Sequence, residues 1–313
     1  MQRHSSQKIS VVIVTHNRNR QLTSCISSIN QLFKKPDEIV VLDNSESSSA
    51  QQVINLMSNH ANIKYVKIKN NNRLGYARHL GFRFANNNIV CFIDDDAYAL
   101  PGWTKEIALE FSKNPSVAAI RGKIETSAIS NYWSSFSQVF EESFIKFPFR
   151  RHETDFLIGA NFALNKSVCL RNGIQFDKSL IGGEDIDISI KLKLKNLSIV
   201  YLPKASVLHD YRLTLLTYYY RWIDYTLFDF ELKNRFNAPF FFAEYIPKRR
   251  RESVLLPFHI IAVFVHKCTV FLRKTSLKWL LGIVVKEIAT LTGMLLLLIK
   301  YRNFLLSKLG KKV

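Results

Sequence analysis

The sequence predicts an α/β protein in which helices flank a mostly parallel, Rossmann-like sheet. Short β-branched runs alternate with amphipathic stretches along the first part of the chain, which is typical of strands joined by crossover helices. The strand ends are polar, as expected where a ligand binds beyond the carboxyl ends of parallel strands. The 313 residues are 47% hydrophobic, which is enough to bury a full core.

Each predicted element is a short apolar or amphipathic run bounded by polar residues. The predicted strands are Ile9–Val14, Glu38–Leu42, Ile63–Ile68, Ile89–Ile93 and Val117–Arg121. The predicted helices are Arg18–Leu32, Ser47–Asn59, Gly75–Ala85 and Gly102–Ser112. Pro101 precedes the last of these, where its fixed φ suits a helix start. After about Ile124 the alternation weakens and aromatic residues become dense.

The net charge of +19 requires an anionic partner, and nucleic acid, anionic lipid and phosphorylated substrates all qualify. From Glu244 to Val313, fourteen Lys and Arg face three Asp and Glu, a net charge of +11. Because this charge lies among aliphatic runs and no recognised nucleic-acid motif is present, we expect no nucleic-acid partner.

Cysteine usage and the N-terminus favour a cytoplasmic protein. The cysteines are scattered at Cys25, Cys91, Cys169 and Cys268, which suggests neither a disulfide framework nor a zinc cluster. The first seven residues are polar, and the apolar run that follows is too short for a signal-peptide core.

An acidic run, Asp94-Asp95-Asp96, directly follows the predicted strand Ile89–Ile93. Three adjacent carboxylates repel one another, so the run makes most sense with a divalent cation, and oxygen ligands suit Mg²⁺ or Mn²⁺. The alternative is a solvated acidic turn.

Other polar residues have both a functional and a structural interpretation. Glu184-Asp185 follows two glycines and opens a predicted helix, so it is either catalytic or an N-terminal cap. His209 ends an apolar run and is either a metal ligand or a structural histidine. Asp43 either caps the next helix or accepts a hydrogen bond from a nucleotide base.

Taken together, these segments resemble the family 2 glycosyltransferases of GT-A fold. The motifs that carry the resemblance are Val11-Val12-Ile13-Val14-Thr15-His16-Asn17-Arg18, Asp43, Asn72-Arg73-Leu74-Gly75-Tyr76-Ala77-Arg78, Phe92-Ile93-Asp94-Asp95-Asp96, Gly159-Ala160-Asn161-Phe162-Ala163 and Gly183-Glu184-Asp185-Ile186-Asp187. They occur in the family's order and span roughly Ile9 to His209. One departure is His79, where the family often has Asn.

The resemblance implies an inverting transfer of a sugar from a nucleotide-sugar donor to a glycan or lipid-linked acceptor. The implied substrate-binding residues are Thr15, Asn17, Arg18, Asp43, Asn72, Arg78, Asp94, Asp95, Gly159, Asn161 and Glu184. Asp185 is the implied catalytic base, which would take the proton of the acceptor hydroxyl. Asp96 and Asp94 are the implied metal ligands, and His209 matches the metal-binding histidine of galactofuranosyl- and rhamnosyl-type members.

The basic tail favours association with an anionic membrane surface. Lys248-Arg249-Arg250-Arg251 precedes the apolar run Val254–Val265, a pairing that suits headgroup contact followed by shallow insertion. A longer run, Trp279–Ile299, carries Lys286 and Glu287 near its middle, each at about 2.5–3.5 kcal/mol on insertion scales. We therefore expect in-plane helices rather than a transmembrane hairpin. The alternative is an amphipathic bundle packed on the catalytic domain.

These observations divide the chain into three predicted parts. Residues 1–210 form a GT-A catalytic domain, 211–246 an aromatic helical extension and 247–313 a basic, membrane-associating tail. The protein is expected to be cytoplasmic and peripheral on the inner face of the membrane. Rival functions are a polyprenyl-phosphate sugar transferase, a nucleotidyltransferase, a basic nucleic-acid- or membrane-binding protein, and a catalytically silent scaffold.

Overall fold

The structure is a computed structural model that describes residues 7–46, 49–57, 62–68, 73–126, 131–143, 149–211, 213–236, 265–273 and 275–309. The chain divides into two compact units. The first comprises Met1–Ile129 and Ile145–Tyr211, and the second comprises Ser130–Phe144 and Arg212–Val313. Asn72, the basic cluster 248–251 and the apolar run 254–264 lie outside the described residues. The predicted three-part division stays a prediction.

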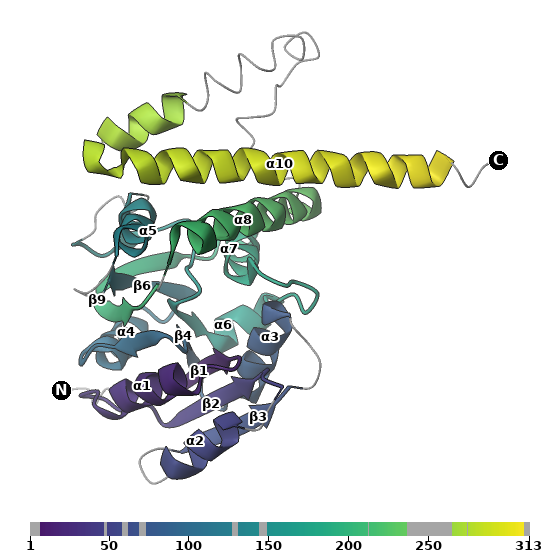
Figure 1. Cartoon of the computed structure of the whole chain (residues 1–313). Coiled ribbons are helices and arrows are strands. Elements are labelled where there is room, and N and C mark those ends of the chain that lie inside the picture. Colours follow the sequence, from purple (N-terminus) through teal and green to yellow (C-terminus); the bar gives the residue numbers. More distant parts are fainter. Residues whose placement is uncertain are drawn as a thin grey trace. The chain divides into compact units, whose positions relative to one another are not determined.

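The first unit is built on a mixed sheet (Figure 1). Its strands are β1 (Ile9–Thr15), β2 (Glu38–Asp43), β3 (Ile63–Lys67), β4 (Ile89–Asp94), β5 (Ala97–Ala99), β6 (Ala119–Thr126), β7 (His152–Glu153), β8 (Asn161–Asn165) and β9 (Ile199–His209). Their order is β3-β2-β1-β4-β8-β6-β9-β5, with β7 paired to β9. Strands β1 to β4 are parallel, whereas β8 is antiparallel to both β4 and β6. The predicted α/β class and mostly parallel sheet are confirmed.

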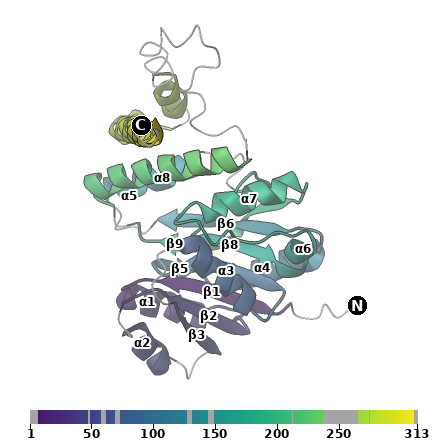
Figure 2. The ribbon, with the colours of Figure 1, turned by 90° about the vertical axis from the view of Figure 1, so that its right-hand side faces the viewer.

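Helices cover this sheet. They are α1 (Asn19–Asn30), α2 (Ser49–Met57), α3 (Leu74–Phe84), α4 (Trp103–Lys113), α6 (Lys166–Arg171) and α7 (Glu184–Leu194). In Figure 2, α1 and α2 lie together at one side of strands β1 to β3. Helix α3 packs closely on β1, because a Cβ atom added to Gly81 would lie 2.3 Å from Cγ1 of Val12. Glycine at this position therefore fixes the depth of α3 against the sheet.

The core of the first unit is apolar and rich in aromatic contacts. The rings of Phe92 on β4 and Phe162 on β8 stack with centroids 4.5 Å apart. Phe176 packs edge-on against Phe92 at 5.3 Å. All three side chains are buried, which fits the large hydrophobic contribution of aromatic residues to a core. This packing holds β8 beside β4, the strand that ends at Asp94.

The second unit is helical. It contains α5 (Tyr132–Glu142), α8 (Leu215–Phe236), a helical segment at residues 265–273, the 3₁₀ turn η3 (Leu277–Trp279) and α10 (Leu280–Leu309). Helices α8 and α10 pack against each other and cross, since Figure 2 shows α10 end-on and α8 lengthwise. A Cβ atom at Gly293 of α10 would lie 2.9 Å from Cβ of Thr226 on α8, so glycine permits this close approach. Tyr218 on α8 is fully buried in this unit.

Candidate active site

The parallel strands bring three polar side chains to one edge of the sheet. Val14 on β1 is paired with Asp94 on β4, and Thr15 is paired with Asp43 on β2. Because carboxyl ends of parallel strands meet at the same edge, the register alone gathers the strand-end residues. His209 joins them from the end of β9, where it is paired with Ala97 of β5.

Asp94, Asp96 and His209 form a cluster that could hold a metal ion. One ligand atom from each lies within 4.8 Å of the others. Nε2 of His209 is 3.0 Å from Oδ1 of Asp96 and 3.9 Å from Oδ2 of Asp94. Two carboxylates and one imidazole form a donor set that fits a divalent cation with mixed oxygen and nitrogen ligands. The residues predicted as metal ligands are thus brought together.

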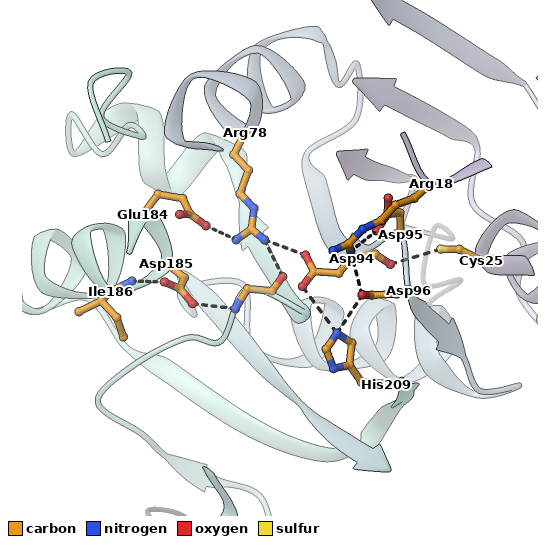
Figure 3. Close-up of polar contacts among 11 residues, drawn as sticks. Arg18, Cys25, Arg78, Asp94, Asp95, Asp96, Glu184, Asp185, Ile186 and His209 are labelled. Carbon is orange, nitrogen blue, oxygen red and sulfur yellow. Dashed lines mark hydrogen bonds and ion pairs between the residues drawn. The ribbon is translucent and has the colours of Figure 1, made fainter. Parts of the chain in front are cut away.

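Two arginines flank this cluster. Nη1 of Arg18 contacts Oδ2 of Asp96 at 2.9 Å, and Nη2 of Arg78 donates to Oδ1 of Asp94 at 3.0 Å (Figure 3). Each of the two carboxylates therefore has one oxygen on an arginine and its second oxygen toward His209. Arg18 is half exposed, whereas Arg78 is buried, so only Arg18 is accessible to a ligand from solvent.

Asp95 differs from its two neighbours because it is buried. Its Oδ2 accepts a hydrogen bond of 2.7 Å from the hydroxyl of Thr15, and its Oδ1 lies 3.2 Å from Nη1 of Arg18. Burial raises the pKa of Asp95 to about 6, and the bond from Thr15 opposes that rise. Thr15 and Asp95 thus tie β1 to the acidic run, and their predicted contact with substrate stays a prediction.

Asp43 lies in a separate polar cluster at the end of β2. It is fully buried and accepts from Ser45 N at 2.8 Å, from the Tyr65 hydroxyl at 2.7 Å and from Lys67 Nζ at 3.0 Å. Burial acts to raise its pKa, but these hydrogen bonds outweigh burial and lower it. The motif analysis missed Tyr65 and Lys67, although the two-residue period of β3 puts both on one face.

Asn17 lies beside this cluster in a left-handed conformation, with φ of 54°. Its backbone N–H donates to Oγ of Ser45 at 2.7 Å, which links the turn after β1 to the turn after β2. Asparagine tolerates positive φ better than most residues, so the motif residue suits this turn. The backbone geometry thus explains Asn17 whether or not its amide contacts a donor.

The guanidinium of Arg78 contacts three other residues of the site. Its guanidinium contacts Glu184 at 2.7 Å, Asp94 at 3.0 Å and the carbonyl of Gly159 at 3.0 Å (Figure 3). The guanidinium also lies 5.3 Å from the centroid of the Phe162 ring. Burial raises the pKa of Glu184, because a charged carboxylate is poorly solvated there, and Arg78 opposes that rise.

Asp185 occupies the first turn of α7. Its Oδ2 accepts from the N–H of Gly159 at 2.8 Å, and its Oδ1 accepts from the N–H of Ile186 at 2.9 Å. Gly183, with φ of 73°, turns the chain into the helix. Burial raises the pKa of Asp185, while Arg78 and the two backbone N–H groups act to lower it. The carboxylate is thus held by two backbone N–H groups, and its predicted role as the catalytic base stays a prediction.

Asn161 does not direct its side chain toward these carboxylates. Its amide donates to the carbonyls of Lys123 at 2.8 Å and Ala205 at 2.9 Å, and accepts from Trp103 Nε1 at 2.8 Å. The residue is fully buried, so these bonds hold β8 against β6 and β9. Gly122 makes room for the amide, since a Cβ there would lie 2.2 Å from Nδ2 of Asn161. A contact of Asn161 with substrate stays a prediction.

Comparison with known proteins identifies the class. Residues 10–171 match the family described as Glycosyl transferase family 2, and the chain belongs to that family. The pre-mycofactocin glycosyltransferase of Mycobacterium tuberculosis is 22% identical over 67% of this chain and 44% of its own length. The chain thus spans less than half of that curated relative.

Solved structures confirm the GT-A fold. TarS of S. aureus, in a structure with UDP-GlcNAc, has a TM-score of 0.56 at 17% identity, covering 92% of this chain and 89% of that one. GalNAc-T7, in a structure with UDP, GalNAc and Mn²⁺, has a TM-score of 0.56 at 18% identity, covering 91% and 58%. At these identities the likeness concerns the fold, and the particular rhamnosyl- or galactofuranosyl-type subtype is not distinguished.

Proposed function

We propose that this protein is an inverting, metal-assisted glycosyltransferase that moves a sugar from a nucleoside-diphosphate donor to a hydroxyl group of a glycan or lipid-linked acceptor. The observation that carries the proposal is that the first unit contains two groups of side chains suited to this reaction. One is the cluster of Asp94, Asp96 and His209, and the other is the Asp185 carboxylate on two backbone N–H groups. The first suits a diphosphate–cation complex, and the second suits proton abstraction.

The proposed reaction is a single displacement. Asp185 takes the proton of the acceptor hydroxyl while the hydroxyl oxygen forms a bond to the anomeric carbon of the donor. The bond from that carbon to the β-phosphate oxygen breaks, and the nucleoside diphosphate leaves with its electron pair. Attack opposite to the leaving group inverts the anomeric centre. Asp94, Asp96 and His209 would hold a divalent cation, which would supply Lewis-acid stabilisation of the diphosphate charge.

The ends of β1 and β2 are proposed to bind the nucleotide. Arg18 is half exposed and adjoins the acidic cluster, so its guanidinium is suited to contact donor phosphates. Asp43 is proposed to fix the base side of the pocket together with Tyr65 and Lys67, which cover its carboxylate. Asn72 lies outside the described residues and keeps its predicted donor contact as a proposal. His209 supports a rhamnosyl- or galactofuranosyl-type enzyme, with Mg²⁺ or Mn²⁺ as the cation.

The experiment that tests this function is a donor screen. The purified protein, with Mn²⁺ or Mg²⁺ added, is incubated with a panel of nucleotide sugars, and release of nucleoside diphosphate is measured. Product analysis separates the rivals, because a nucleotidyltransferase releases pyrophosphate, and a polyprenyl-phosphate sugar transferase requires a lipid phosphate acceptor. Absence of nucleoside diphosphate release with every donor and acceptor class would contradict the proposal.

The second unit is proposed to attach the enzyme to the cytoplasmic face of an anionic membrane. Among the described residues, one helical segment, Leu277–Leu297, is long and apolar enough to cross a membrane. Lys286 and Glu287, near its middle, are buried and form an ion pair of 2.6 Å. The Lys286 ammonium also lies 5.0 Å from the Phe140 ring of α5 and 4.9 Å from the Trp222 ring of α8.

This packing leaves an apolar face of α10 and the preceding turn in contact with solvent. Its exposed residues are Leu277, Leu280, Leu281, Ile288, Leu295, Leu296 and Ile299. Exposed basic residues, Arg273 and Lys278, lie beside it in the chain. A helix that directs its charged pair into its own unit and its leucines outward suits insertion parallel to a membrane surface better than a span.

A further inference from the structure

The side chain of Arg78 is buried at the point where three segments of the first unit meet. It lies on α3 and contacts Asp94 at the end of β4, the carbonyl of Gly159 before β8, and Glu184 at the start of α7. We propose that Glu184 and Arg78 form a buried bridge that positions both halves of the active site. In this proposal Glu184 acts through Arg78 and is a positioning residue rather than a sugar-binding one.

The first half of the site is fixed through Asp94. Arg78 holds Oδ1 of Asp94, which leaves Oδ2 facing Nε2 of His209 at 3.9 Å. Groups that hydrogen-bond to metal ligands orient them, and loss of such partners typically lowers metal affinity or activity about 10–100-fold. Arg78 is therefore expected to determine how Asp94 enters the metal cluster.

The second half is fixed through one peptide group. The carbonyl of Gly159 accepts from Arg78, and the N–H of the same residue donates to Asp185 at 2.8 Å. A Cβ atom added at Gly159 would lie 2.8 Å from Nη2 of Arg78, so a larger residue there would displace the guanidinium. The contacts Glu184–Arg78–Gly159–Asp185 thus run without a gap from the buried carboxylate to the proposed base (Figure 3).

Burial makes this bridge specific for arginine and glutamate. The side chains of Arg78 and Glu184 are 4% and 2% exposed, which leaves little access for a sugar hydroxyl. A planar guanidinium can serve three partners in different directions at once, whereas an ammonium group is a point charge on a flexible stem. Lysine at position 78 would retain the charge and lose the simultaneous contacts.

The surrounding helix packing holds Arg78 in place. Gly75, one turn earlier on α3, donates its N–H to the carbonyl of Leu180 at 3.1 Å. A Cβ at Gly75 would lie 2.2 Å from the carbonyl oxygen of Asp177, so the segment before α7 lies directly against α3. This close packing brings Glu184 within reach of Arg78.

The test measures each half of the site without the transfer reaction. Glu184→Gln should lower the affinity for Mn²⁺ alone by about 10–100-fold in calorimetry. It should also speed hydrogen exchange at the Gly159 amide, since Arg78, which holds the carbonyl of Gly159, would no longer be held by Glu184. Arg78→Lys should reproduce both effects, and it keeps the test decisive if the glutamine variant does not fold. The control is Glu110→Gln, which removes the buried half of the Glu110–Arg151 pair, of 2.8 Å, on α4. This control should bind Mn²⁺ as the wild type does.

The proposed bridge rests on the proposed function, but different experimental results would contradict each of them. A wild-type protein that transfers no sugar would overturn the function and leave the Mn²⁺ and exchange measurements as a test of the bridge. Folded Glu184→Gln and Arg78→Lys proteins with unchanged Mn²⁺ affinity and unchanged Gly159 exchange would overturn the bridge. Where transfer is observed, kcat is measured at saturating Mn²⁺, so that weaker metal binding does not contribute. Glu184→Gln should then reduce kcat when introduced into the wild type but have little further effect when introduced into Asp185→Asn, because no base remains to be positioned.

Discussion

Nε2 of His209 lies 3.0 Å from Oδ1 of Asp96, although 113 residues separate them in the chain. The contact exists because β5, which follows the acidic run, pairs with the end of β9, with Ala97 opposite His209. The pairing of β5 with β9 thus places the imidazole of His209 beside the carboxylate of Asp96. Asp94, Asp96 and His209 therefore form a cluster that could hold a metal ion, whose occupation is tested by the first prediction below.

Asp96→Ala should abolish divalent-dependent binding of a nucleotide sugar. Asp96 contributes one of the three ligands, and the other carboxylates would face donor phosphates with less compensation. Calorimetry with Mn²⁺ and donor, before and after chelation, measures the effect. The matched control is Asp155→Ala, an exposed carboxylate paired with Lys193. Donor binding that is insensitive to both chelator and Asp96→Ala would mean that the acidic run holds no cation.

Asp185→Asn should leave donor binding intact and lower turnover by about 10²–10⁴-fold, because an amide cannot accept the acceptor's proton. The amide oxygen can still accept one backbone N–H, so the fold should be retained. Steady-state kinetics with donor titration separates the two effects. Normal turnover with weakened donor binding would assign Asp185 to the donor site instead of to proton transfer.

Asp43→Asn should destabilise the first unit by about 1–3 kcal/mol at neutral pH, since three hydrogen bonds to a buried carboxylate are weakened. The pKa of Asp43 is lowered in the folded state, so its stabilisation is fully present above the unfolded value of about 3.9. It is lost as pH falls through the lower folded value. The difference in unfolding free energy between wild type and Asp43→Asn should therefore shrink below about pH 4. A difference that stays constant on acidification would show that the charge of Asp43 is not what stabilises the site.

The sequence predicted the parallel strands and their polar ends because both depend on local pattern. Strands β1 to β4 begin and end within two residues of their predicted bounds. The last predicted strand, Val117–Arg121, is β6, which runs from Ala119 to Thr126. The later antiparallel strands were not predicted. Strand β5 is only three residues long, and β8 begins within the motif from which Gly159 and Asn161 were predicted to bind substrate.

The sequence indicated candidate residues of the site, but not the contacts that their side chains make. Acids at strand and helix ends are visible in a sequence, so Asp94, Asp96 and Asp185 could be proposed directly. The burial of Arg78 could not, because it depends on Gly159, which is 81 residues away in sequence, and on Glu184. Similarly, Asn161 has its side-chain partners on β6, β9 and α4, and only tertiary structure reveals that its amide is engaged.

The attachment of the second unit to membranes can be tested by substitution rather than truncation. Helix α10 packs on α8, and removing it would expose the buried side chains of Tyr218 and Thr226. Leu281→Glu combined with Leu295→Glu instead changes two residues that are already 57% and 56% exposed. The double variant should fold normally and lose at least about tenfold in affinity for anionic vesicles, because two apolar groups can no longer insert.

A matched control and the salt dependence complete this last prediction. Leu194→Glu, at a position 65% exposed on α7, makes the same chemical change in the first unit and should leave vesicle binding unchanged. High salt should weaken binding of the wild type only in part, since screening removes attraction by the basic residues and leaves insertion. Equal vesicle binding by the double variant and the wild type would exclude the α10 face. The in-plane model would be wrong if the wild type resisted carbonate extraction and residues 301–313 could be labelled from the far side of the membrane. Those results would indicate a transmembrane helix, with Lys286 and Glu287 inside the bilayer.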